Sequence, residues 1–123
     1  VGLKLRKFPD EVIKQHYSAH AERPFYPALV EFMTSGPVIA IALEGKDAIT
    51  VVRGLMGKTN SAQADPGTIR GDYAMSFSNN LVHGSDSPEA SVTELALFFG
   101  EDGDLVDWTP DQTTWVYSGE ELS

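Results

Sequence analysis

His83 is the residue whose neighbours best fit chemistry. It lies in the polar segment 79–87, and Gly84 follows it directly. A glycine has no side chain, so a bulky group can approach the imidazole closely. Ser87, Pro88 and Glu89 then predict a helix start, where free backbone N–H groups favour an anion. These local features leave two readings open, a nucleophilic or acid/base histidine and a structural one.

Glu94 is the carboxylate best placed to act with His83. It follows Ser87 by seven positions in the sequence, about two turns into the expected helix. If the chain folds back at the start of that helix, the Glu94 carboxylate would orient the imidazole ring.

The other two histidines, His16 and His20, are four positions apart and share one face of an expected helix. Imidazoles at this spacing can bind a metal ion together, but a zinc site needs at least a third protein ligand. The sequence offers no obvious third ligand near them, so a metal role for this pair is the weaker hypothesis.

Two short motifs are weak evidence for a function. Residues 54–59 end like a phosphate-binding Walker loop, but Val52 stands where the motif needs its first glycine, and a helix precedes the segment rather than a strand. The tripeptide at 70–72, Arg-Gly-Asp, resembles an integrin-binding motif. In an acidic chain without cysteine we interpret it as a coincidence.

Composition bounds the class of protein. The 123 residues suit a single domain, and 9 basic against 18 acidic residues give a net charge of −9. That charge argues against a nucleic-acid partner held on a basic surface. The absence of cysteine excludes a disulfide scaffold and a thiol nucleophile. No apolar stretch suits a bilayer and residues 1–8 do not resemble a secretory leader, so we expect a cytoplasmic protein without a membrane partner.

The acidic residues are densest near the end of the chain, where residues 101–123 hold seven acids and neither Lys nor Arg. One interpretation is a solvated surface that keeps the protein soluble. The other is adaptation to high salt, which screens carboxylate repulsion. The second predicts that stability rises with ionic strength.

Hydrophobic periodicity predicts the elements that would position these residues. We expect strands at 1–8, 38–43 and 73–77, the second being a central strand covered on both faces. Helices are expected from 9 to about 20 and at 26–33, 45–56 and 87–99, with a long loop at 57–71. Three aromatic residues of the tail are expected to pack on a surface of this chain or of a neighbour: Trp108, Trp115 and Tyr117. The class is α+β.

Four sequence blocks together resemble the nucleoside diphosphate kinase family. Residues 80–87 read Asn-Leu-Val-His-Gly-Ser-Asp-Ser, and the blocks at 23–26, 33–38 and 66–72 follow the family order and spacing. The resemblance implies a ferredoxin-like α+β sandwich, an antiparallel sheet covered by helices. It also implies ping-pong transfer of a γ-phosphoryl group from a nucleoside triphosphate to a nucleoside diphosphate. The acidic composition resembles that of enzymes from salt-loving archaea.

The same resemblance assigns roles to single residues. His83 would be the nucleophile, oriented by Glu94 and assisted by Ser85. The phosphates would be held by three side chains, Arg53, Thr59 and Arg70, with Tyr17 nearby. Asn80 would contact the sugar and Phe25 would stack on the base. Mg²⁺ would arrive with the nucleotide phosphates, and the family usually forms homo-oligomers, commonly hexamers.

One family feature is missing from the start of the chain. Family members begin with a strand that carries a Lys-Pro-Asp-Gly block, followed by a helix, and neither precedes Val1 here. We expect residues 1–123 to be one kinase domain recorded without its first strand and helix. The alternative is a catalytically impaired, acidic nucleotide-binding or assembly module of the same fold, because the family lysine of that block contacts the nucleotide.

Overall fold

The computed structural model describes residues 1–121 and confirms the α+β class. Two strands, β1 (Gly2–Arg6) and β2 (Val38–Ala42), pair antiparallel, with Leu3 opposite Ile41 and Lys4 opposite Ala40. Both strands lie where apolar alternation or a β-branched run predicts them.

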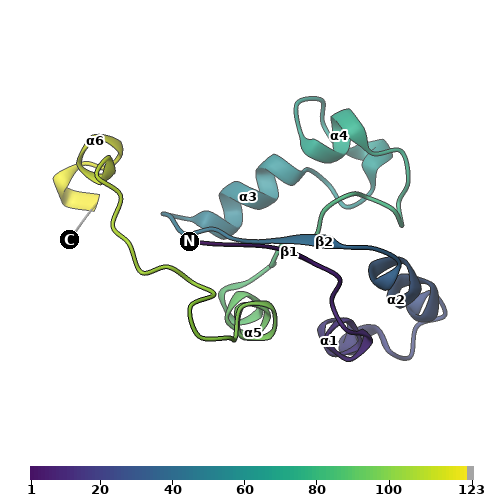
Figure 1. The fold of residues 1–123 in the computed structure, drawn as a ribbon. Helices are drawn as coiled ribbons and strands as arrows, with labels where there is room; N and C mark the ends of the chain where they lie inside the picture. Colours follow the sequence, from purple (N-terminus) through teal and green to yellow (C-terminus); the bar gives the residue numbers. More distant parts are fainter. Residues whose placement is uncertain (122–123) are drawn as a thin grey trace.

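The helices lie on both sides of this ribbon. In Figure 1, α1 (Asp10–His16) and α5 (Pro88–Phe98) lie below the strands, and α3 (Ala48–Met56) and α4 (Ile69–Tyr73) lie above. The helix α2 (Tyr26–Thr34) follows α1, and α6 (Thr113–Val116) lies in the tail. Residues 1–121 also contain three short 3₁₀ turns: η1 (Ser18–His20), η2 (Ser61–Gln63) and η3 (Gly119–Glu121).

The helix starts follow local rules. Pro9 precedes α1, and two acids, Asp10 and Glu11, occupy the first turn, where the helix dipole favours negative charge. The helix ends at His16, earlier than expected, and the chain continues to His20 as η1. The Ser87 side chain accepts a hydrogen bond from the Ala90 N–H (3.1 Å) and so caps α5.

The hydrophobic core lies between α1, α2 and α5. Phe8, Ile13 and Val30 are its buried members, and the Phe98 ring packs edge-on against Phe8 with centroids 5.0 Å apart. This packing fixes α5 against α1. It therefore sets the distance between side chains at the end of α1 and those in the middle of α5.

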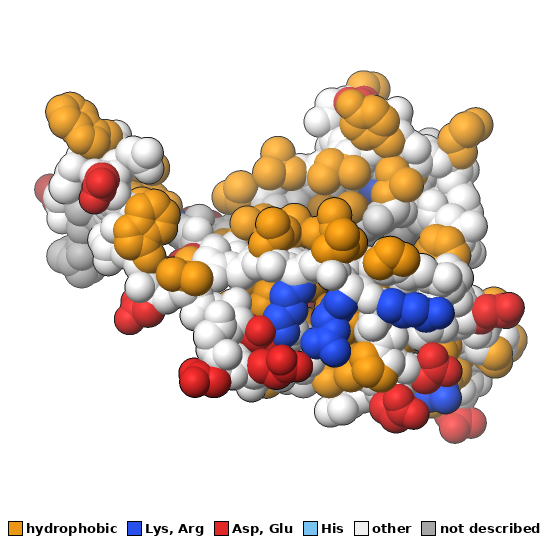
Figure 2. All heavy atoms as spheres, in the orientation of Figure 1, with side chains coloured by type: hydrophobic (Ala, Val, Ile, Leu, Met, Phe, Trp, Pro, Cys, Tyr) orange, Lys and Arg blue, Asp and Glu red, His pale blue; other side chains and the backbone are white. Residues whose placement is uncertain are grey.

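The expectation that strand 38–43 is covered on both faces is wrong for the described residues. Ile39 and Ile41 are more than half exposed, as are Leu3 and Leu5 opposite them. Figure 2 shows these strands as a band of hydrophobic side chains above a row of Lys and Arg. The continuous apolar run predicts burial only if other residues pack on both faces, and within residues 1–121 the helices leave the face formed by these four side chains exposed.

The expected strand at 73–77 is also wrong. Tyr73 is the last residue of α4, and residues 74–77 have no regular structure. Within residues 1–121 the sheet has two strands, so this segment lacks the hydrogen-bonded neighbour that a strand needs. The Ser61 hydroxyl donates instead to the Ser76 carbonyl (2.9 Å). The expected loop at 57–71 holds η2 and the first turn of α4.

The tail residues make few contacts with the rest of the chain. Of the three aromatic residues, Tyr117 contacts the body, because its hydroxyl accepts from the Lys46 backbone N–H (3.3 Å). Trp108 and Trp115 are exposed, and their packing on a neighbouring surface stays a prediction. No helix in the described part of the chain is long and apolar enough to cross a membrane.

Candidate active site

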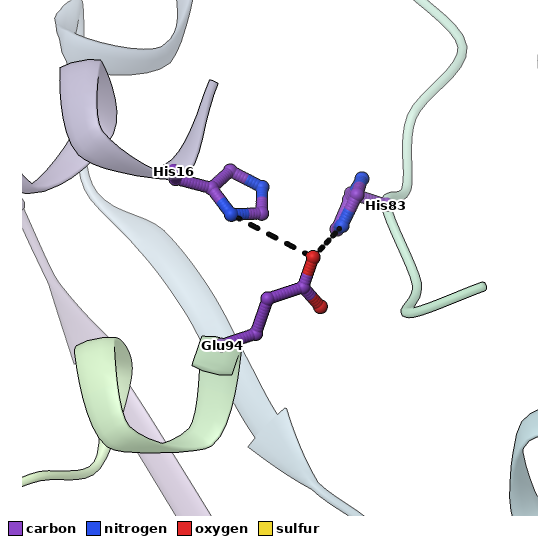
Figure 3. Close-up of side chains that lie close together, drawn as sticks. All are labelled: His16, His83 and Glu94. Carbon is purple, nitrogen blue, oxygen red and sulfur yellow. Dashed lines mark hydrogen bonds and ion pairs between the residues drawn. The ribbon is translucent and has the colours of Figure 1, made fainter. Parts of the chain in front are cut away.

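His83, Glu94 and Ser85 form one hydrogen-bonded group. His83 Nε2 lies 3.0 Å from Glu94 Oε1, and the Ser85 hydroxyl donates to the other carboxylate oxygen, Oε2. Figure 3 shows the Glu94 side chain reaching from α5 toward the His83 ring. An ionised carboxylate can only accept, so this contact requires the proton on Nε2 and leaves a lone pair on Nδ1. The predicted pairing of Glu94 with His83 is thus present in the fold.

The backbone at Gly84 passes close to α3. A Cβ at this position would lie 2.6 Å from the sulfur of buried Met56, so only glycine fits without a shift. Close passage here and the cap at Ser87 together turn the chain back along α5. The His83 side chain itself remains 46% exposed, so a ligand in solution can reach it.

A tight turn precedes His83. Leu81 has a φ of +73°, and the Val82 N–H donates to the Asn80 carbonyl (2.9 Å), which closes a γ-turn. A left-handed conformation is unfavourable for a leucine and persists only where the surroundings impose it.

The Arg70 guanidinium supplies that constraint. It is buried, and it donates to the carbonyls of Gly57 (2.9 Å), Asn80 (3.3 Å) and Val82 (2.7 Å). Two of these carbonyls flank Leu81. Burial, and secondly the nearby Arg53 charge, lower the pKa of Arg70. Arg70 therefore holds the turn while placing a positive charge beneath the site.

Arg53 bonds to the residue that follows His83. Its Nη1 donates to the Gly84 carbonyl (3.3 Å), and its side chain is exposed. The two arginines thus bond to carbonyls of Val82 and Gly84, the residues on either side of His83. Among residues 1–121 neither arginine forms an ion pair with a carboxylate. The two guanidinium groups therefore lie beside the loop that carries His83, where they can attract an anion.

The remaining predicted residues lie around this centre. The Asn80 side chain donates to the Thr59 carbonyl (3.0 Å), which ties the two predicted ligands together. The Tyr17 ring lies 6.1 Å from the His83 ring, and burial, then Glu94, raises its pKa. Exposed Phe25 is farther out, with its ring 5.8 Å from that of His20.

His16 is the residue of this site that sequence reasoning missed. Its Nδ1 lies 3.7 Å from Glu94 Oε1, and its ring is 4.6 Å from the His83 ring. The side chain is 4% exposed. Burial, and secondly His83, lower its pKa to about 4, although Glu94 acts in the opposite direction. The spacing of His16 to His20 suggested a metal pair with that residue. The sequence signal that could have placed His16 in the site is its position next to Tyr17, a predicted site residue.

Comparison with known proteins decides the family. The sequence pattern of the family described as nucleoside diphosphate kinase matches residues 1–103. The chain belongs to this family. It is 52% identical over 117 residues to a nucleoside diphosphate kinase of Synechococcus sp. (strain JA-3-3Ab), covering 95% of this chain and 78% of the relative. A nucleoside diphosphate kinase of Deinococcus radiodurans is 58% identical over 106 residues, covering 86% of this chain and 76% of the relative.

A solved structure of a family member has the same fold. A halophilic nucleoside diphosphate kinase from Halobacterium salinarum, determined with CDP, superposes with a TM-score of 0.90 at 49% identity. The match covers 95% of this chain and 78% of that one. The predicted ferredoxin-like α+β fold of the nucleoside diphosphate kinase type is confirmed, and so is the predicted class of enzyme, a phosphotransferase.

Proposed function

We propose that this nucleoside diphosphate kinase chain moves the γ-phosphoryl group of a nucleoside triphosphate to a nucleoside diphosphate through a phosphohistidine at His83. The observation that supports it is the placement of the imidazole. Its Nε2 is bonded to Glu94, and the residues on both sides of it are held by the guanidinium groups of Arg53 and Arg70. A nucleophile whose neighbouring residues are bonded to two guanidinium groups suits an anionic, phosphorylated substrate.

The first half-reaction starts at Nδ1. Its lone pair attacks the γ-phosphorus as the bond to the bridging oxygen of the β-phosphate breaks, and the nucleoside diphosphate leaves with that electron pair. The ring then carries a proton on Nε2 and the phosphoryl group on Nδ1. The Glu94 carboxylate stabilises the positive charge of this ring, and Ser85 fixes the carboxylate by donating to it. A second nucleoside diphosphate reverses the steps.

The other predicted residues would bind the nucleotide. We assign Arg53, Arg70 and Thr59 to the phosphates, with the hydroxyl of Tyr17 nearby. Asn80 would contact the sugar. The exposed ring of Phe25 suits stacking on a base, which any common base permits.

Mg²⁺ is proposed as a companion of the nucleotide. The Glu94 carboxylate is engaged by His83 and Ser85, and the third side chain near it is the imidazole of His16. This donor set does not suit a hard cation that prefers oxygen ligands. The chain therefore leaves Mg²⁺ to the nucleotide phosphates, whose charge it would neutralise.

Labelling with γ-labelled ATP tests the proposal. We expect an acid-labile, alkali-stable label on the wild-type protein and none on His83→Ala. The matched control is His20→Ala, which removes an exposed histidine outside the hydrogen-bonded group and should keep the label. A wild type that binds nucleotide without becoming labelled would support the alternative, a catalytically impaired module. A label that survives His83→Ala would refute the proposed nucleophile.

We further propose a homo-oligomer, a hexamer by family resemblance. The exposed apolar face of β1 and β2 supports association, because large uncovered apolar patches are typical of interaction surfaces. Light scattering on the eluting peak of a size-exclusion column would measure the mass, and a monomer at micromolar concentration would contradict it. A cytoplasmic location stays a prediction that cell fractionation would test.

Adaptation to high salt is our proposal for the acidic composition. The net charge of −9 favours it, since carboxylate repulsion weakens as salt shortens the screening length. We expect the midpoint of thermal unfolding to rise between low and molar KCl. A midpoint that stays constant or falls would favour a merely solubilising surface.

A further inference from the structure

Three side chains of the site present metal-ligating atoms to one point. One nitrogen each of His16 and His83 and one oxygen of Glu94 lie within 4.8 Å of one another. Figure 3 shows both rings turned toward the same carboxylate oxygen, Oε1. Around a tetrahedral ion, ligand atoms at bond lengths near 2.1 Å are about 3.4 Å apart. The His83 side chain is half exposed, so a rotation of its ring can make the small movement this requires while the backbone stays held.

We propose that His16, His83 and Glu94 bind one Zn²⁺ ion and that this ion blocks the nucleophile. Two imidazoles and one carboxylate with an open fourth position form the ligand set of many three-ligand zinc sites. The same set discriminates against Mg²⁺, which prefers oxygen ligands. The site is therefore selective for a transition metal over the ion that accompanies the nucleotide.

The packing of His16 favours coordination. The rings of Phe98 and Tyr17, with centroids 5.1 Å and 4.3 Å away, fix the orientation of the imidazole. Glu94 supplies the negative charge. Ser85 donates to Glu94 Oε2, the carboxylate oxygen that does not face the two rings. Hydrogen bonds of this kind orient the side chains that bind a metal.

Inhibition follows from the two nitrogens of His83, and this part rests on the proposed function. Coordination uses the lone pair of Nε2, so the proton on that atom must move through solvent to Nδ1. The ring stays neutral and no proton is released. Nδ1 then has no lone pair to attack phosphorus, and Glu94 is no longer available to Nε2.

Calorimetric titration with Zn²⁺ in the absence of nucleotide tests the site directly. We expect one ion per chain in the wild type, unaffected by excess Mg²⁺ and reversed by EDTA. His16→Asn should weaken binding by more than about 100-fold, because a lost supporting residue alone costs 10- to 100-fold. His20→Asn is the matched control, since it removes a nearby histidine outside the cluster, and should bind as the wild type does.

Circular dichroism checks that His16→Asn folds. If it does not, His83→Asn replaces it, because that half-exposed side chain can be changed with less disturbance of the core. A wild type that binds no Zn²⁺, or binds it no more tightly than the folded His16 or His83 variant, overturns the site. Binding that disappears in His20→Asn alone places the metal elsewhere and overturns it too.

The labelling reaction distinguishes the proposed zinc site from the proposed phosphohistidine at His83. Zn²⁺ added before Mg²⁺–ATP should reduce the initial labelling rate of the wild type, and each variant is compared with its own metal-free rate. The reduction should be lost in His16→Asn and kept in His20→Asn. Zn²⁺ binding without a His83 label would refute the phosphohistidine and leave the site standing. A His83 label without Zn²⁺ binding would do the opposite.

Discussion

Residues 79–87 and residues 104–121 are both polar segments with little long regular structure, yet they are held very differently. The first is bonded to Arg70, to Arg53 and to α5. The second contacts the body at a few points, among them the ion pairs Lys4–Asp104 and Lys46–Glu121. Figure 1 shows α6 standing apart from the other helices.

Burial separates residues 79–87 from the end of the tail, whereas the Lys4–Asp104 pair at the start of the tail is itself largely buried. The Arg70 guanidinium is buried and Gly84 lies against buried Met56, so water cannot replace the lost partner when a contact there is removed. In the tail, Trp115 is 88% exposed, and Glu121 and Lys46 are surface residues. Contacts in water are weak, because solvent competes for both partners. An ordered loop therefore needs buried donors more than it needs many contacts.

Removal of the Arg70 guanidinium should lower the stability of the protein more than any other change considered. Arg70→Met leaves three carbonyls without their donor, two of them at the strained turn before His83. We expect the free energy of unfolding to fall by about 3 kcal/mol, measured by urea denaturation. Lys46→Met is the matched control in the tail and should change the free energy far less. Equal changes in the two variants would contradict the contrast between the segments.

Gly84→Ala probes the same segment through packing. The added methyl group would lie 2.6 Å from Met56 Sδ, so α3 and the loop must separate or Met56 must repack. Overpacking of this kind costs about 2 kcal/mol, measured by urea denaturation. Gly119→Ala is the control, since nothing lies within 4 Å of its Cβ position. A Gly84 variant as stable as the Gly119 variant would show that the loop is looser than its contacts indicate.

The sequence predicted what depends on local rules. The strands β1 and β2 follow from hydrophobic periodicity, and the start of α5 follows from its cap. The pairing of His83 with Glu94 follows from the position of Glu94 about two turns into that helix. The segment 73–77 was mispredicted, because alternation cannot supply a neighbouring strand. The bonds from Arg70 to carbonyls ten to thirteen residues away depend on where the fold places α4 against residues 57 and 80–82. The approach of His16 to Glu94 depends on the packing of α1 against α5. No local pattern encodes such contacts.

Acid should weaken the site before it affects the tail. Burial lowers the pKa of His16 from 6.5 to about 4. Between these values the unfolded chain binds a proton that the folded chain does not, so stability is full above pH 6.5 and falls as the pH approaches 4. We expect a loss of about 2 kcal/mol between pH 7 and pH 4.5, measured by urea denaturation at both pH values. The Lys46 ammonium lowers the pKa of Glu121, so the tail pair is lost only below the ordinary range of a glutamate.

Variants of the two histidines test this assignment. His16→Gln should lose less stability on acidification than the wild type, although it starts from a lower value. His20→Gln removes a histidine from the neighbouring turn and should keep the wild-type loss. An unchanged acid response in His16→Gln would mean that another group carries the proton.

The smallest effect is expected where an aromatic side chain meets only water. Trp115→Leu should change the free energy of unfolding by less than about 0.5 kcal/mol, as surface substitutions generally do. The matched substitution Phe8→Leu, in the core at 4% exposure, should cost about 1 kcal/mol or more because the ring of Phe98 loses its edge-on partner. Both are measured by urea denaturation at concentrations where light scattering gives the same mass. A larger loss of stability for Trp115→Leu than for Phe8→Leu would mean that the tail packs against another copy of the chain. The surface of Trp115 that is exposed in the single chain would then belong to an interface.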